Sequence, residues 1–174
     1  MFESKLPNLG VSIFSQMSGL ANEFSAINLS QGFPEFDAPD LLKTQLNYYV
    51  QQGVNQYSPS SGVPRLQQQI ADLAKRKYAA DINAADQVTV TSGATEALFV
   101  AIQTIVRPSD EVIVFDPAYD SYQPAIELAG GKSVHIVLSA PNYTIDWQVV
   151  SQAITKNTRA IIINTPHNPS GKIL

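Results

Sequence analysis

The chain has 174 residues, of which 44% are hydrophobic and 15% charged, and its net charge is -4. These values are typical of a soluble globular domain with a core, and they give no positive field for nucleic acid or an anionic membrane, so small molecules are the expected partners. The absence of cysteine excludes disulfides, thiolate metal sites and a cysteine nucleophile, and favours a cytoplasmic location. No stretch is long and apolar enough for a signal peptide or a membrane span, and His135 and His167 lie without carboxylate spacing, so no metal site is predicted.

The N-terminal half predicts helices without strands. Residues 1–36 lack a strong hydrophobic period and predict an N-terminal arm or irregular cap, ahead of an α/β domain over 37–174. Amphipathic helices are predicted at 38–52 and 64–78, because their Leu, Ile and Tyr residues fall on single stripes. The stretch between these helices is rich in Gly, Pro, Ser and Asn, which indicates an irregular surface loop.

The second half alternates Val- and Ile-rich runs with helix-like segments. This order is typical of parallel strands joined by right-handed crossover helices, and it predicts an α/β fold with a mostly parallel sheet. Asp146 is a candidate N-cap. The expected strands are 87–91, 111–115, 132–138 and 159–164, and the expected helices are 94–106, 119–129 and 146–156. Because the sequence stops after the last strand with no closing helix, we expect an interrupted sheet with an uncovered edge or face.

The first strand-to-helix junction, VTVTSGATEALFVAI, favours an anion site. Gly93, Ala94 and Thr95 stand at the start of a helix, where backbone N–H groups and the helix dipole attract a phosphate. The alternative is a helix cap in which Ser92 or Thr95 serves the chain's own amides. Both interpretations stay open at this point.

The second junction, VFDPAYDSYQP, supplies an aromatic at the same edge of the predicted sheet. Tyr119 could stack on a flat heteroaromatic ligand. The alternative is that Tyr119 and Tyr122 pack on a neighbouring element. Asp116, which precedes Pro117, is more typical of a turn than of an acid catalyst.

The third junction, IIINTPHNPSG, brings Asn164, His167 and Asn168 to that edge. An asparagine there can hydrogen-bond a ring oxygen, although a proline-bound turn with a surface histidine would use the same residues. Together the three junctions indicate a nucleotide or a phosphorylated heterocycle, since open α/β sheets bind ligands at this edge. A dinucleotide fold is disfavoured because the first junction lacks a G-x-G-x-x-G pattern.

Five ordered strings make the sequence resemble a known family along nearly its whole length. They are INLSQGFPEFDAPD, NQYSPSSGVPRLQQQIA, VTVTSGATEALFVAI, FDPAYDSYQPAI and IIINTPHNPSGK. They resemble fold-type I, class I/II pyridoxal-phosphate-dependent aminotransferases, in particular the methionine aminotransferase and kynurenine–oxoglutarate aminotransferase branch. The resemblance implies part of the large domain of that fold, with the C-terminal small domain absent.

The resemblance also implies roles for residues at the three junctions. Gly93, Ala94 and Thr95 would donate hydrogen bonds to the phosphate of pyridoxal 5'-phosphate. Tyr119 would stack on the pyridine ring, and Asn168 would hydrogen-bond the phenolic oxygen of that ring.

Three further residues are implied outside the junctions. Tyr57 would reach the cofactor phosphate of a second subunit, so the intact enzyme is expected to be a homodimer. Gly32 would lie beside the substrate carboxylate, and Phe14 would line the side-chain pocket, although Phe14 could equally be a packed apolar residue.

The implied activity is transfer of an amino group from methionine or an aromatic amino acid to a keto acid. The family's covalent cofactor lysine, its ring-nitrogen aspartate, a supporting tyrosine and a carboxylate-binding arginine are all expected beyond the N-P-S-G string. Lys172 matches a different lysine of the family pattern, so no catalytic residue is assigned and the 174-residue chain is expected to be inactive. The alternatives are a non-catalytic binding or assembly module, or part of a carbon–sulfur β-lyase that uses the same cofactor.

Overall fold

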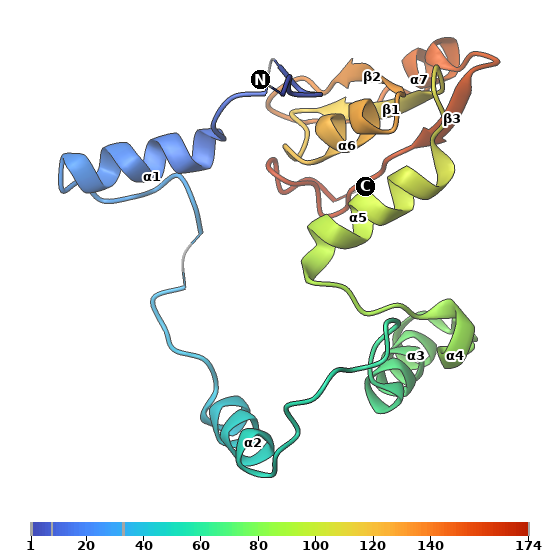
Figure 1. The fold of residues 1–174 in the computed structure, drawn as a ribbon. Helices are drawn as coiled ribbons and strands as arrows, with labels where there is room; N and C mark the ends of the chain where they lie inside the picture. The colour runs from blue at the N-terminus through green and yellow to red at the C-terminus, as the bar shows by residue number, and fades with distance from the viewer. Residues whose placement is uncertain (1, 8, 33, 174) are drawn as a thin grey trace. The chain divides into compact units, whose positions relative to one another are not determined.

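The structure, a computed structural model, describes residues 2–7, 9–32 and 34–173 (Figure 1). It divides into two compact units, one made of Met1–Ser12 with Ser92–Leu174 and the other of Ile13–Thr91. In the described part of the chain, no helix is both long and apolar enough to cross a membrane. The predicted division between an arm over 1–36 and a domain over 37–174 concerns the intact family fold and stays a prediction.

The Ile13–Thr91 unit is helical, as its sequence predicts, but it has two helices more than expected, α1 (Ile13–Glu23) and α4 (Ala84–Gln87). Its other helices are α2 (Asp40–Gln51) and α3 (Pro64–Tyr78). Helix α1 falls inside the predicted irregular arm. Its apolar stripe is Ile13, Met17 and Leu20, continued by Phe24 just after the helix ends, at helical spacing with Ser, Gly and Gln between them. Several of these side chains line an apolar hollow of about 440 Å³ beside residues 26–30.

The predicted strand at 87–91 is wrong. Gln87 ends α4, and its side-chain oxygen accepts a hydrogen bond from the Asn83 backbone N–H at 2.8 Å. The backbone groups after α4 do not hydrogen-bond to a strand. Instead, the Val90 N–H donates to the Ser61 carbonyl, and the Gln67 side chain donates to the Val88 carbonyl. A sheet ladder needs a neighbouring strand for these groups, and here a loop and a side chain take that place.

Gln67 is a buried polar residue of α3, with an exposed fraction of 4%. Its Nε2 donates to the carbonyls of Val88 at 2.7 Å and Ser61 at 3.3 Å. Because Gln67→Leu leaves a buried carbonyl without its donor, we expect the free energy of unfolding to fall by about 1–3 kcal/mol. Chemical denaturation measures this loss. The matched control is Gln68→Leu, whose exposed amide contacts only the Asp72 carboxylate, and equal losses in both variants would contradict the assigned role of Gln67.

The second unit contains a three-stranded parallel sheet with crossover helices, which confirms the α/β prediction. Its strands are β1 (Glu111–Asp116), β2 (Lys132–Val137) and β3 (Thr158–Ile161), in the order β2-β1-β3. Its helices are α5 (Gly93–Ile105), α6 (Tyr122–Leu128) and α7 (Trp147–Ala153). Asp146 caps α7 as predicted, accepting from the backbone N–H of Gln148 at 2.9 Å. Helix α6 begins later than the expected residue 119 because residues 117–121 form a turn that starts at Pro117.

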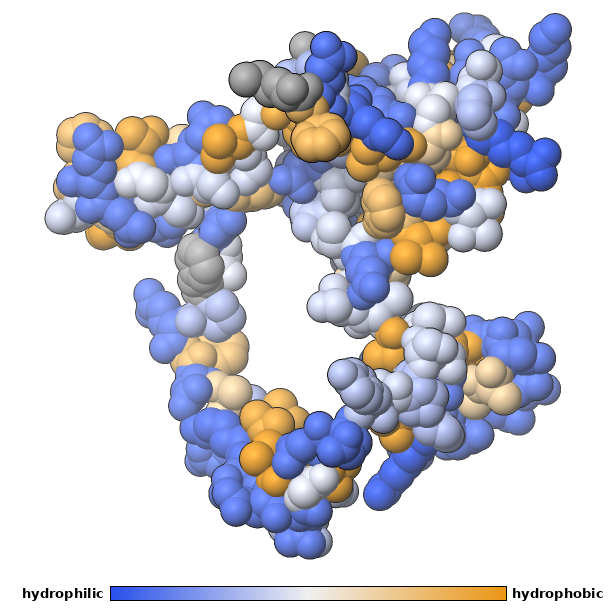
Figure 2. Space-filling model, viewed as in Figure 1, coloured by the Kyte–Doolittle hydropathy of each residue, from blue (hydrophilic) through white to orange (hydrophobic). Residues whose placement is uncertain are grey.

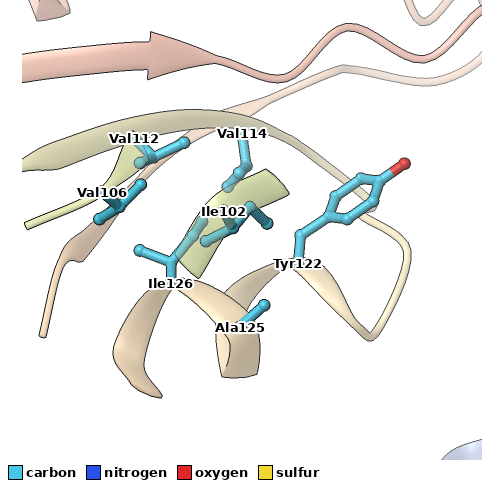
Figure 3. Close-up of a cluster of buried hydrophobic side chains, with 7 residues drawn as sticks. All are labelled: Ile102, Val106, Val112, Val114, Tyr122, Ala125 and Ile126. Atoms are coloured by element: carbon cyan, nitrogen blue, oxygen red, sulfur yellow. The ribbon is translucent and has the colours of Figure 1, made fainter. Parts of the chain in front are cut away.

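Strand β1 is buried on both faces of the sheet. Val112 and Val114 point to a core shared with α5 and α6, in which Ile126 is fully buried (Figure 3). Ile113 and Phe115 point to a second core, shared with β2 and α7. Helices therefore cover β1 from both sides, as crossover connections in a parallel sheet require. Apolar side chains also remain exposed on the described residues, including Leu41, Leu42 and Leu46 of α2 (Figure 2).

Candidate functional site

The carboxyl ends of β1 and β3 lie at one edge of the sheet. The two strands are parallel, with Ile113 opposite Ile161, and the Ile162 N–H donates to the Ile113 carbonyl at 3.0 Å. The loops that follow these strands contain Tyr119 and Asn168. The topology therefore brings two of the predicted junctions to the same edge.

The start of α5 has the backbone that an anion site needs. Gly93 has a φ of +82°, which side chains other than hydrogen rarely allow, and a Cβ placed there would meet no atom within 4 Å. The Ser92 side chain makes no cap bond; instead, the Ser92 N–H donates to the Glu96 carboxylate. The amides of Ala94 and Thr95 have no acceptor within the helix. The open space in front of Gly93 is thus bordered by donors aligned with the helix dipole.

Tyr119 lies beside this turn. Its hydroxyl oxygen is 3.4 Å from the Thr95 hydroxyl oxygen, so the first two junctions meet. The ring is half-buried and packs edge-on against Tyr122, with centroids 5.8 Å apart and planes at 66°. Tyr122 itself lies in the core, where burial raises the pKa of its phenol and the neighbouring Tyr119 raises it further. Packing thus accounts for Tyr122, whereas Tyr119 keeps an accessible surface.

The loop after β3 is a tight turn that keeps Asn168 exposed. His167 is buried, contrary to the expectation of a surface histidine, and its Nδ1 is 2.7 Å from the Ser170 hydroxyl oxygen. The Asn168 backbone N–H donates to the Asn164 side-chain oxygen at 2.7 Å, and Asn168 is exposed. Asn164 and His167 line a small hollow with Tyr122. The turn therefore borders Tyr122, although no hydrogen bond in the described part of the chain joins Asn168 to Tyr119.

The remaining predicted site residues lie in the Ile13–Thr91 unit. Tyr57 is fully exposed in the loop between α2 and α3, Gly32 is exposed, and Phe14 is half-buried in α1. Their roles stay predictions. Among the residues that the structure describes, no group of three or more His, Asp or Glu side chains could hold a metal ion.

One pair of residues at this edge was not predicted. The Asp116 carboxylate oxygens lie 2.9 and 3.1 Å from the His135 Nδ1. The sequence indicated only a turn at Asp116, since nothing in it reveals that β2 pairs beside β1 in the register that brings these side chains together. The pair borders a cavity of about 410 Å³ that Tyr119 also lines.

Comparison with known proteins gives one consistent family. The model of a family described as aminotransferase class I and II matches residues 25–174. The methionine aminotransferase of Escherichia coli is 51% identical over 171 residues, and the probable N-succinyldiaminopimelate aminotransferase of Mycobacterium tuberculosis is 38% identical over 176. The alignments cover 98% and 100% of this chain and 44% of each relative.

Solved structures agree. An Escherichia coli protein with an identified methionine aminotransferase function superposes with a TM-score of 0.95 at 50% identity, covering 99% of this chain and 45% of that protein. The N-succinyldiaminopimelate aminotransferase of Mycobacterium tuberculosis gives a TM-score of 0.93 at 37% identity, covering 99% and 46%. The chain thus spans less than half the length of the relatives that it matches.

Proposed function

Because the chain belongs to the class I and II aminotransferases, we propose that it forms the N-terminal part of an enzyme that transfers amino groups with pyridoxal 5'-phosphate. The observation that carries this proposal is the contact between Thr95 and Tyr119, which joins the open space at the start of α5 to an accessible aromatic ring. Members of this family use that cofactor. When bound, it supplies an electron sink for the substrate's Cα carbanion.

The described residues fit the cofactor's parts. Gly93, Ala94 and Thr95 would bind the phosphate, Tyr119 would stack on the ring, and the side-chain amide of exposed Asn168 would hydrogen-bond the ring's phenolic oxygen. Stacking and hydrogen bonding on three sides fix the plane of the ring. A fixed plane is what a substrate needs if its Cα–H bond is to be broken in one orientation.

The other unit supplies three further positions in this proposal. Exposed Tyr57 would bind the cofactor phosphate of a second subunit in a homodimer. Gly32 would lie beside the substrate carboxylate, and Phe14 would line the pocket for the substrate side chain. We place the enzyme in the cytoplasm, in keeping with a sequence that has no cysteine.

The proposed substrates are methionine or aromatic amino acids. The 51% identity to a methionine aminotransferase supports the first, and a 33% identity to a human kynurenine–oxoglutarate transaminase supports the second. The residue that binds the cofactor covalently would lie outside these 174 residues. The chain alone would then hold the cofactor weakly and not turn it over.

A direct test compares the 174-residue chain with a longer protein that contains it and reaches the length of the relatives. Each is mixed with pyridoxal 5'-phosphate, methionine or an aromatic amino acid, and a keto acid, and the new amino acid is measured. We expect product from the longer protein alone, because only it would hold the cofactor covalently. Strong transamination by the short chain would overturn the assignment of the lysine.

The same assay separates the other candidate functions. Release of pyruvate from cysteine conjugates without transamination would identify a carbon–sulfur β-lyase. A longer protein that neither binds the cofactor nor transforms amino acids would favour a binding or assembly module, and would contradict the proposed function.

A further inference from the structure

The last residue of β1 is held from two sides. The Asp116 carbonyl accepts a hydrogen bond from the Leu138 N–H at 2.7 Å, and the Asp116 carboxylate meets the His135 Nδ1 at 2.9 Å. His135 lies opposite Val114 in the parallel register, so it reaches diagonally along one face of the sheet toward Asp116. A carboxylate can only accept, so in this pair the His135 Nδ1 carries the proton and donates it to Asp116.

Two residues, Pro117 and Ala118, separate Asp116 from the proposed stacking residue Tyr119. Asp116 ends β1 and Tyr119 lies in the turn of residues 117–121, which belongs to no helix or strand. No sheet hydrogen bonds join residues 117–121. At one end of the turn the Tyr122 N–H donates to the Tyr119 carbonyl at 3.2 Å, and at the other end is Asp116.

Ala118 and Tyr119 pack against the core that β1 shares with α5 and α6, whereas on the side of His135 the turn borders a cavity. The cavity of about 410 Å³ beside it is lined by Asp116, Ala118, Tyr119 and Asp120. An open space of this size leaves room for the turn to move inward. A hydrogen bond at Asp116 therefore has more influence on the turn than it would have in a close-packed site.

Charge strengthens this dependence. The cavity is also lined by Glu127, so three carboxylates, those of Asp116, Asp120 and Glu127, face a space in which His135 is the one basic side chain among the lining residues. Without His135, the Asp116 carboxylate would lose this donor and share the cavity with two like charges. Like charges repel, which would favour a shift of the end of β1 and its turn.

We infer that His135 is a positioning residue for Tyr119: through Asp116 it fixes the turn that presents the aromatic ring to the cofactor. The inference rests on the proposed function. It separates two parts of the site, because the backbone N–H groups of Gly93–Thr95 belong to α5, whereas Tyr119 meets α5 at the Thr95 hydroxyl. Loss of His135 should weaken recognition of the ring and leave recognition of the phosphate intact.

The test measures dissociation constants for pyridoxal 5'-phosphate and for inorganic phosphate in the protein that contains this chain. His135→Leu is expected to weaken binding of pyridoxal 5'-phosphate by about 3- to 10-fold and to change phosphate binding by less than about 2-fold, since one charge-assisted hydrogen bond is lost away from the phosphate. His135→Asn should restore cofactor binding to within about 2-fold, because its side-chain N–H can take the place of Nδ1–H. Lys132→Ala, at the exposed opposite end of β2, is the control and should leave both constants unchanged.

The outcomes distinguish the inference from the proposed function. Unchanged cofactor binding in His135→Leu, an equal loss for phosphate and cofactor, or no rescue by His135→Asn would each overturn the positioning role. If His135→Leu does not fold, His135→Gln replaces it. The glutamine amide N–H lies one bond farther from the backbone than the Nδ1 of His135, so it should miss Asp116 and give the same selective loss. Failure of the unmodified protein to bind pyridoxal 5'-phosphate would instead overturn the proposed function.

Discussion

Tyr119→Ala is expected to weaken the binding of pyridoxal 5'-phosphate by about 10- to 100-fold, which corresponds to the loss of about 1.4–2.7 kcal/mol. The half-buried ring of Tyr119 packs edge-on against Tyr122, and its hydroxyl contacts the Thr95 hydroxyl at the start of α5. The accessible side of the ring is therefore oriented before the ligand binds. An oriented ring loses little conformational entropy on stacking. Fluorescence or absorbance titration of the cofactor measures the effect.

Two variants define the cause of that loss. Tyr119→Phe keeps the ring and loses only the long hydroxyl contact, so its affinity should stay within about 3-fold of the unmodified protein. Tyr78→Ala removes an exposed tyrosine at the end of α3 and should have no effect. Equal affinities for Tyr119→Ala and Tyr119→Phe would contradict a stacking role.

Ile126→Ala is expected to lower the free energy of unfolding by about 2–5 kcal/mol, the largest stability effect that we predict. Ile126 has an exposed fraction of 0% and packs between α5 and β1 (Figure 3). Truncation leaves a cavity that the surrounding valines and Ile102 cannot fill without moving α6. Denaturant unfolding of the protein that contains this chain measures the change.

A graded series checks the mechanism. Ile126→Val removes one methylene group and should cost about 0.5–1.5 kcal/mol. Ile154→Ala removes the same atoms as Ile126→Ala from a residue that is 52% exposed, and should change stability by less than about 0.5 kcal/mol. Similar losses for Ile126→Ala and Ile154→Ala would show that the core around Ile126 is not close-packed.

Much of this fold could be predicted from periodicity. The predicted helix at 64–78 coincides with α3, and β1, β2 and β3 fall within one to three residues of the expected strands, because their apolar runs are dense and bounded by turn residues. Helix α1 was missed because four apolar residues carry its stripe among small and polar ones. The false strand at 87–91 has the right composition, but whether such a segment joins a sheet depends on a partner strand that its own residues do not specify.

The individual residues of the site could be predicted from the sequence, but the contacts between them could not. The three junctions could be identified because strand ends followed by Gly, Tyr or Asn are recognisable in one dimension. The contact between Thr95 and Tyr119 joins residues 24 positions apart, and the pair of Asp116 and His135 depends on the register between two strands. Register follows from packing on both faces of a sheet, which no local pattern records.

Because β1 is buried on both faces, its position along its own axis is fixed. The position of the residues that follow β1 at the ligand-binding edge of the sheet is fixed with it. A slip of one residue along its axis would exchange the side chains of Val112 and Val114 with those of Ile113 and Phe115 between two cores of different shape. Each step would also move the strand's end by about 3.3 Å, more than the tolerance of a stacked ring. The height at which Tyr119 meets a ligand is therefore set by aliphatic side chains that never touch that ligand.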